Sequence, residues 1–291
     1  MKLFLQLTKS GIVGFVLLTG FAGYALSHEP YSEWNWLHLA ETLLALYFFS
    51  AGSFALNQAQ EWQIDKLMPR TTGRPIPSGK ITVLKASIIG FTFLILGVVF
   101  GWLVNLAVMW LGVATVLLYN ILYTLYWKRK WAFGAVPGAI PGAMPVVIGY
   151  AANSSHLTNP ELIYAFLIMF FWQMPHFWAL AIRFRDDYSK GGIPVLPTQI
   201  GTDATLFHIG MYMFAYIGLA VASPWITSAY LFYPLLVIPI SVKVLIEFFR
   251  YYREAGQKGW LPFFLWTNLS VLIFLLGPVL DKWFQHHLHQ I

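Results

Sequence analysis

The chain has 291 residues, of which 58% are hydrophobic and only 10% are charged. An average soluble domain has about one quarter of its residues charged, so this composition excludes a soluble globular protein, and the high hydrophobicity excludes a disordered one. The sequence contains no cysteine, which excludes disulfide scaffolds, thiolate catalysis and cysteine-bound metal centres. The remaining class is an integral membrane protein.

Nine apolar segments are long enough to cross a bilayer as helices, because a spanning helix needs about 20 residues. Their continuous apolar character favours an all-α, polytopic membrane protein over a β-barrel, whose strands alternate apolar and polar residues. The first segment is expected to be a span rather than a cleaved signal peptide, because residues 27–30 make a poor cleavage site. The nine expected spans are residues 11–27, 37–56, 83–102, 104–126, 132–152, 162–182, 205–225, 229–249 and 262–284.

Basic residues are distributed asymmetrically about these spans. All 18 lysines and arginines except Lys282 fall near the N-terminus or around the connections after the second, fourth, sixth and eighth segments. Positive charge marks the cytoplasmic side, so we expect a cytoplasmic N-terminus and an external C-terminus. With no long extension of the mitochondrial type, we expect a bacterial cytoplasmic membrane. This topology explains the net charge of +6, and nucleic-acid binding is not expected.

The first long polar connection, residues 57–82, begins with a stripe of oxygen-bearing side chains. Asn57, Glu61 and Asp65 are spaced four apart, which places them on one face of a helix. Carboxylate and amide oxygens suit Mg²⁺, which commonly takes one or two carboxylates together with substrate phosphate. Arg70 and Arg74 follow with the same spacing, and arginine offers paired donors to phosphate. The pattern predicts a diphosphate site; the alternative is a solvated loop whose acids neutralise nearby basic residues.

The second long polar connection, residues 183–204, also places acids beside basic residues. Asp186 and Asp187 are adjacent, and the intervals from His176 to Arg183 and on to Asp187 predict one shared helical face. An ionisable residue within a membrane span is a functional candidate. His176 is a candidate to ligate iron, to contact a substrate carboxylate or to transfer a proton. The alternative is a buried histidine that bonds a neighbouring helix at the kink expected from Pro175.

Weaker candidates lie on the fourth expected span. Asn120 and Tyr123 either line a cavity or bond between helices, and the sequence does not decide between these roles. Lys128 follows in the basic connection after this span.

These residues resemble the UbiA superfamily of membrane prenyltransferases. Residues 57–79 resemble its first acidic motif, although Glu61 stands where aspartate is usual and Asp186 and Asp187 are adjacent rather than spaced. More narrowly, the chain resembles the branch that farnesylates heme. That narrower likeness is carried by Arg70-Thr71 with Arg74-Pro75, by Tyr123-Thr124 with Lys128-Arg129, by Pro175-His176-Phe177-Trp178, and by Asp186-Asp187-Tyr188 with Gly192-Ile193-Pro194-Val195-Leu196-Pro197.

The resemblance implies a single membrane-embedded domain over residues 1–291, in a UbiA-type bundle with a central cavity capped by residues 57–82 and 183–204. It implies Mg²⁺-dependent transfer of the farnesyl group of farnesyl diphosphate to a vinyl group of heme b, which is a substrate rather than a cofactor. The implied metal ligands are Asn57, Glu61, Asp65, Asp186 and Asp187. Substrate contacts are implied for His176, Arg70, Arg74, Lys128, Arg183, Tyr123 and Asn120.

Two other functions stay open at this stage. A UbiA-type enzyme acting on an aromatic or quinone-precursor acceptor would keep the same metal and diphosphate site. A non-enzymatic transporter would also carry polar patches within its helices, although such patches are expected nearer the bilayer midplane. Besides the lipid bilayer, a heme-modifying enzyme or a terminal oxidase assembly is an expected downstream partner.

Overall fold

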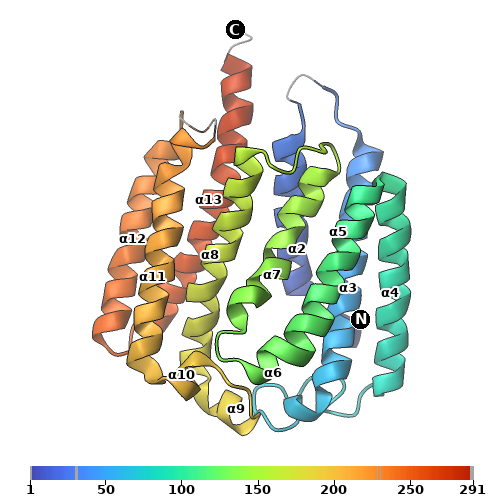
Figure 1. Cartoon of the computed structure of the whole chain (residues 1–291), viewed down its shortest axis with the longest axis vertical. Coiled ribbons are helices and arrows are strands. Elements are labelled where there is room, and N and C mark those ends of the chain that lie inside the picture. Colours follow the sequence, from blue (N-terminus) through green and yellow to red (C-terminus); the bar gives the residue numbers. More distant parts are fainter. Residues whose placement is uncertain (1, 30–31, 228, 230, 289–291) are drawn as a thin grey trace. The chain divides into compact units, whose positions relative to one another are not determined.

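The computed structural model describes residues 2–29, 32–227, 229 and 231–288, and every regular element within them is helical (Figure 1). These residues form two compact units, each described by itself below. The first unit comprises residues 1–27, 33–155 and 186–194, and the second comprises residues 28–32, 156–185 and 195–291. The all-α, multi-pass membrane architecture expected from the sequence is confirmed.

Seven helices within the described residues are long and apolar enough to cross a membrane. The two remaining expected spans also contain helices, but these helices are either too short or too polar to count as spans by the same measure of length and composition. Residues 132–152 correspond to α7 (Ala135–Ala151), which has 17 residues and contains Pro141 and Pro145. Residues 229–249 correspond to α12 (Tyr233–Arg253), which carries Lys243, Glu247 and Arg250. The structure therefore supports seven of the nine spans by length and composition.

The first unit is built around a long helix, α3 (Trp36–Asp65), which continues beyond the expected span into the polar segment. Its N-terminus is capped by the Asn35 side chain, which accepts a hydrogen bond from the backbone N–H of His38. The other helices of this unit are α1 (Lys2–Leu7), α2 (Ser10–Ser27), α4 (Val83–Val104), α5 (Leu106–Val116), α6 (Lys128–Lys130), α7 and the short α9 (Arg185–Lys190), of which all but Arg185 belongs here.

Glycines allow α2 and α7 to pack backbone to backbone. A Cβ atom added to Gly149 would lie 1.9 Å from the carbonyl oxygen of Gly20, and one added to Gly23 would lie 1.9 Å from that of Val146. No larger residue fits at these positions without moving a helix. This contact fixes α2, and with it the residues at its N-terminal end.

A π-helix, η1 (Leu117–Trp127), joins α5 to α6. The sequence predicts one continuous α-helix here, because nothing in the apolar pattern distinguishes the two forms. A π-helix is rare and is found mostly at functional sites. Its wider turn frees backbone carbonyls, and side chains from other segments bond two of them: Gln60 Nε2 donates to the carbonyl of Asn120, and Arg129 Nε to that of Thr124.

The second unit contains α8 (Pro160–Arg183), α10 (Leu196–Gln199), α11 (Gly201–Ala222), the 3₁₀ turn η2 (Ser223–Trp225), α12 and α13 (Trp260–Leu288). The carboxylate of Asp281 is buried and accepts hydrogen bonds from the backbone N–H groups of Leu231 and Phe232. It thereby satisfies donors at the start of α12, which lack partners within the helix. Tyr164 of α8 bonds the hydroxyl of Tyr233 and the carbonyl of Phe274, tying α8, α12 and α13 together.

One expectation about helical faces is wrong. His176 and Arg183 lie on α8, but the helix ends at Arg183 and Phe184 leaves the helical conformation with φ −112° and ψ 31°. Asp187 lies on the separate helix α9 and belongs to the first unit. The spacing of seven and four was therefore misleading, because it assumed a helix that the backbone interrupts.

Candidate active site

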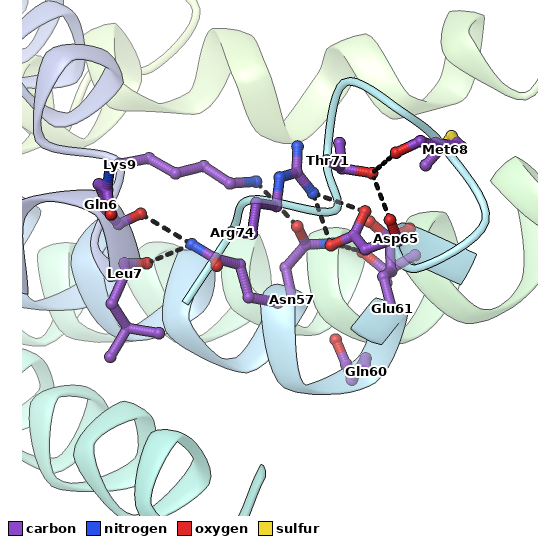
Figure 2. Close-up of polar contacts among 12 residues, drawn as sticks. Gln6, Leu7, Lys9, Asn57, Gln60, Glu61, Asp65, Met68, Thr71 and Arg74 are labelled. Carbon is purple, nitrogen blue, oxygen red and sulfur yellow. Dashed lines mark hydrogen bonds and ion pairs between the residues drawn. The ribbon is translucent and has the colours of Figure 1, made fainter. Parts of the chain in front are cut away.

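The last three turns of α3 carry the predicted oxygen stripe. Asn57, Glu61 and Asp65 lie on this one helix with side chains 2%, 3% and 1% exposed, respectively (Figure 2). Such burial is rare for carboxylates unless they are paired. The stripe is therefore not a solvated loop, and the partners of its oxygens decide what the site can do.

Two cations neutralise the two carboxylates. Lys128 Nζ donates to both oxygens of Glu61, at 2.6 and 2.8 Å. Arg74 Nη1 donates to both oxygens of Asp65, at 2.8 and 2.7 Å (Figure 2). Lys128 comes from the start of α6 and Arg74 from the turn after α3, so residues up to 67 apart in the chain meet here.

A third cation, Lys9, enters from the bend between α1 and α2. Its backbone has φ 51°, a left-handed conformation that is uncommon outside glycine. Gln58 stabilises the bend by donating hydrogen bonds to the carbonyls of Gln6 and Leu7, both at 2.8 Å. The bend points Lys9 Nζ at the Asn57 Oδ1 atom, 2.9 Å away (Figure 2). Burial, reinforced by the positive charge of Arg74, lowers the pKa of Lys9 to about 7, and Glu61 opposes this shift only in part.

The turn after α3 is closed by local bonds and covered by α9. Thr71 Oγ1 donates to the carbonyl of Asp65 at 2.8 Å, which satisfies a carbonyl at the helix end. The Asp187 carboxylate accepts a hydrogen bond from the backbone N–H of Arg70 at 3.1 Å. The Arg70 guanidinium lies 5.8 Å from the ring centre of Tyr188. The two polar connections predicted from the sequence thus meet here, whereas the Asp186 side chain is exposed.

The π-helix supplies the wall opposite the stripe. The Asn57 amide nitrogen donates to Thr124 Oγ1 at 3.2 Å, which turns its oxygen toward Lys9. Asn120 is occupied by α3, because its amide bonds the hydroxyl and carbonyl of Ser53 and the side chain of Gln60. The ring of Tyr123 packs closely against Gly138. A Cβ atom added to Gly138 would lie only 2.5 Å from this ring.

His176 forms a separate polar site within the second unit. Its Nδ1 atom lies 2.9 Å from Asn268 Oδ1 of α13, and its ring is flanked by Trp172 and Phe264, each with ring centres 4.8 Å away. Arg183, at the end of the same helix, places its guanidinium 5.9 Å from the ring centre of Trp260. Aromatic walls around one histidine suit a flat, apolar ligand with a central metal.

The oxygen stripe fits a hard divalent cation. Within the described part of the chain, no three histidine, aspartate or glutamate side chains are close enough to form a metal centre by themselves. Glu61 and Asp65 nevertheless provide two carboxylates, Asn57 provides an amide oxygen, and each of these groups already contacts a positive charge. Mg²⁺ is commonly bound by two carboxylates, with water and phosphate oxygens at its other coordination positions.

Sequence reasoning missed several residues that build these sites. Lys9 was used there only to orient the chain in the membrane, and its contact with Asn57 spans 48 residues. Gln60 carries no motif of its own, and its one signal is its position directly before Glu61 on the polar part of α3. Thr124 entered the sequence analysis only as part of the Tyr123-Thr124 pair, with no role of its own.

The model of the UbiA prenyltransferase family matches residues 16–269. The chain belongs to this family. Within the match lie α3 with its oxygen stripe, the π-helix, His176 and α9, whereas Lys9 lies before it.

Relatives of similar length match nearly the whole chain. A protoheme IX farnesyltransferase from Bdellovibrio bacteriovorus is 50% identical over 99% of this chain and 99% of its own. One from Aquifex aeolicus is 35% identical and covers 93% of this chain and 92% of its own.

Solved structures show the same UbiA fold at lower identity. A digeranylgeranylglyceryl phosphate synthase superposes with a TM-score of 0.77 at 19% identity, over 96% of this chain and 98% of its own. A UbiA homolog from Archaeoglobus fulgidus bound to DMAPP and Mg²⁺ superposes with a TM-score of 0.63 at 16% identity, over 94% and 98% of the two chains. At these identities the likeness concerns the fold alone.

Proposed function

We propose that this UbiA-family protein transfers the farnesyl group of farnesyl diphosphate to a vinyl group of heme b, giving heme O and diphosphate. The single observation that carries the proposal is 50% identity to a protoheme IX farnesyltransferase over 99% of both chains. The buried stripe of Asn57, Glu61 and Asp65 among three cations supports it, because it supplies both a metal-binding set and an anion-binding set.

The diphosphate is assigned to the cations that surround the stripe. Arg74 and Lys128 are the principal donors, because both place their charge next to the carboxylates assigned to the metal, where the diphosphate must lie. Arg70 and Arg183 are further candidates on their own segments. Preorganised positive charge stabilises a leaving group as its negative charge develops, so these side chains lower the barrier to ionisation. Tyr123 and Asn120 are assigned to the wall, with Asn120 holding η1 against α3.

The metal is assigned to Asn57, Glu61 and Asp65, with Asp187 or Asp186 from the second polar connection. Bound Mg²⁺ supplies positive charge that stabilises the departing diphosphate. The chain's own contribution is to hold its oxygens on one rigid helix and to keep the carboxylates largely away from water. Residues 57–82 and 183–204 are proposed to cap this site, and the contact of Asp187 with the Arg70 N–H supports that role.

The reaction breaks the bond between farnesyl C1 and the diphosphate oxygen, and the electron pair leaves with diphosphate. The farnesyl carbon then bonds the terminal carbon of a heme vinyl group, which places positive charge on the inner vinyl carbon. Water adds there and loses a proton, leaving a hydroxyl group beside the new chain. Aromatic faces stabilise a carbocation, and a dry environment protects it from early capture by water.

Heme b is assigned to the second unit through His176. The aromatic flanks of Trp172 and Phe264 offer apolar surface for the porphyrin, while the imidazole offers a nitrogen ligand for its iron. Members of one prenyltransferase family would share the metal and diphosphate site and differ in the molecule that accepts the prenyl group. An aromatic or quinone-precursor acceptor is therefore the alternative to test.

The test is product formation by the purified protein in lipid or detergent. Incubation with farnesyl diphosphate, Mg²⁺ and heme b should give heme O, identified by chromatography and mass. Parallel reactions contain EDTA in place of Mg²⁺, or 4-hydroxybenzoate in place of heme. We expect product only with metal and heme. Prenylated 4-hydroxybenzoate without heme O would favour the alternative acceptor, and no product from protein that retains lipid would contradict an enzymatic role.

The protein is further proposed to lie in a bacterial cytoplasmic membrane with the oxygen stripe at the cytoplasmic side. The complete absence of cysteine permits a clean test. Single cysteines at the exposed positions Lys80 and Ser155 should differ in labelling by an impermeant maleimide on spheroplasts. We expect labelling at 155 only, with both sites labelled after lysis. Labelling at 80 alone would reverse the orientation. We also propose that a heme-modifying enzyme or a terminal oxidase assembly is the downstream partner that receives the product.

A further inference from the structure

All three side chains of the oxygen stripe are engaged by cations of the same chain. Lys9 reaches the Asn57 oxygen, Lys128 reaches both oxygens of Glu61, and Arg74 reaches both oxygens of Asp65. These are the atoms that the proposed function gives to the metal. The cations occupy the ligands that a metal would need.

Two of the same cations have a second assignment. Arg74 and Lys128 are the principal donors proposed for the diphosphate. Lys128 uses two of its three ammonium donors on Glu61, and both Asp65 oxygens hold the Nη1 end of the Arg74 guanidinium, so the full charge of either side chain reaches a phosphate only after the carboxylate releases it. Arrival of metal and diphosphate together lets every charge keep a partner: the carboxylates pair with the metal and the released cations pair with the diphosphate.

Either ligand alone meets an electrostatic penalty. Metal without diphosphate would displace Lys128 and Arg74 from carboxylates that are 3% and 1% exposed, leaving cations with no counter-charge. Diphosphate without metal would draw the cations away and leave buried carboxylates unpaired. A buried charge that loses its partner is strongly destabilising.

We infer that Arg74 and Lys128 are place-holding cations that occupy the carboxylate ligands of the resting protein and couple metal binding to diphosphate binding. This inference rests on the proposed function and adds a binding linkage to it. Because coupling between ligands is reciprocal, each ligand raises the affinity for the other by the same factor. The coupling protects the site from binding metal unproductively in the absence of substrate.

Lys128→Gln provides the first test. This variant removes the cation that competes for Glu61, so it should bind Mn²⁺ more tightly than the wild type when no diphosphate is present, by about 10-fold. Bound Mn²⁺ is measured from the loss of the free-ion EPR signal on purified protein in detergent. Lys66→Gln is the matched control, because it removes a nearby exposed charge whose ammonium lies over the Trp62 ring rather than on a carboxylate. Its affinity for Mn²⁺ should stay within about two-fold of the wild type.

Glu61→Gln provides a reciprocal test that does not depend on the folding of the first variant. It loosens the hold on Lys128, so it should bind inorganic diphosphate in EDTA more tightly than the wild type, by about 10-fold. Binding is followed by calorimetry, with Glu254→Gln as an exposed charge control. Both variants are first compared with the wild type by size-exclusion profile and thermal unfolding.

The outcomes separate this inference from the proposed function. Tighter Mn²⁺ binding by Lys128→Gln together with tighter diphosphate binding by Glu61→Gln, with unchanged controls, supports place-holding cations. A folded variant of either kind that binds its probe no more tightly than the wild type overturns the inference, and heme O formation by the same wild-type preparation shows that the proposed function still stands. A wild type that binds no Mn²⁺ even with farnesyl diphosphate overturns both the metal site and the inference.

Discussion

Asn268 holds the imidazole of His176 in one tautomer. The Asn268 amide nitrogen donates to the carbonyl of Phe264 at 2.6 Å, so its Oδ1 atom is the one that faces His176 Nδ1, at 2.9 Å. An amide oxygen accepts only, and the neutral ring therefore carries its proton on Nδ1. This leaves a lone pair on Nε2, which suits an iron ligand rather than a donor to a heme propionate.

This relationship predicts graded effects on heme binding. His176→Ala removes the ligand and should abolish tight heme b binding, whereas Asn268→Leu frees the ring to rotate and should weaken it by about 10-fold. Both are measured by Soret titration, and the ferric heme spectrum should lose its histidine-ligated character in His176→Ala. His208→Ala is the control, since that ring bonds the carbonyl of Ala204 on its own helix. If His176→Ala gave the wild-type spectrum, His176 would not be the iron ligand and its role would be structural.

The second prediction concerns the acid at the end of α3. Asp65→Asn keeps the size of the side chain and an oxygen for Arg74 but removes the negative charge. We expect turnover to fall by about 100-fold or more, because charge stabilisation at the leaving group is lost. The protein should still purify as a folded monodisperse species. Heme O formation is the assay and Asp203→Asn, an exposed acid at the start of α11, is the control. Prenylation at the wild-type rate would remove Asp65 from the metal site.

The sequence predicted those parts of the site that depend on local periodicity. Asn57, Glu61 and Asp65 share a face because their spacing of four matches one helical turn, and the helix does continue through them. The same rule failed for Asp187, because Phe184 interrupts the helix and no spacing argument detects a break in the backbone.

Long-range contacts were beyond such reasoning. Nothing in residues 117–127 distinguishes a π-helix from an apolar α-helix, yet its freed carbonyls and its turn place Thr124 against Asn57. Lys9 looked like one of many cytoplasmic charges. Only the left-handed bend at residue 9 and the Gln58 bonds that stabilise it bring its ammonium to the stripe.

The third prediction concerns the pH dependence of stability. Burial lowers the pKa of Lys9 to about 7, whereas an unfolded chain gives lysine a pKa of about 10.4. Between these values the unfolded state binds more protons, so the contribution of Lys9 to stability is fully present above about pH 10.4 and is lost as the pH falls through about 7. The wild type should therefore gain thermal stability relative to Lys9→Met from pH 6.5 to pH 9. Tryptophan fluorescence in detergent measures both midpoints. A constant difference across that range would show that Lys9 does not titrate there.

The final prediction concerns the bonds that hold the π-helix to α3. Gln60 uses both ends of its amide, donating to the carbonyl of Asn120 at 3.1 Å and accepting from the Asn120 side chain at 3.2 Å. Gln60→Leu leaves both Asn120 groups without this partner, which should reduce the free energy of unfolding by about 1–3 kcal/mol.

The same change should disturb function, because η1 leads directly into Lys128. A displaced Lys128 weakens its hold on Glu61 and its access to the diphosphate, so we expect a higher KM for farnesyl diphosphate, with a smaller loss in kcat. Gln63→Leu is the matched control, since Gln63 is an exposed glutamine on the same turn region of α3. Equal kinetics for Gln60→Leu and Gln63→Leu would mean that the π-helix keeps its register without the Gln60 bonds. A KM effect confined to Gln60→Leu would establish them as the support on which Lys128 depends.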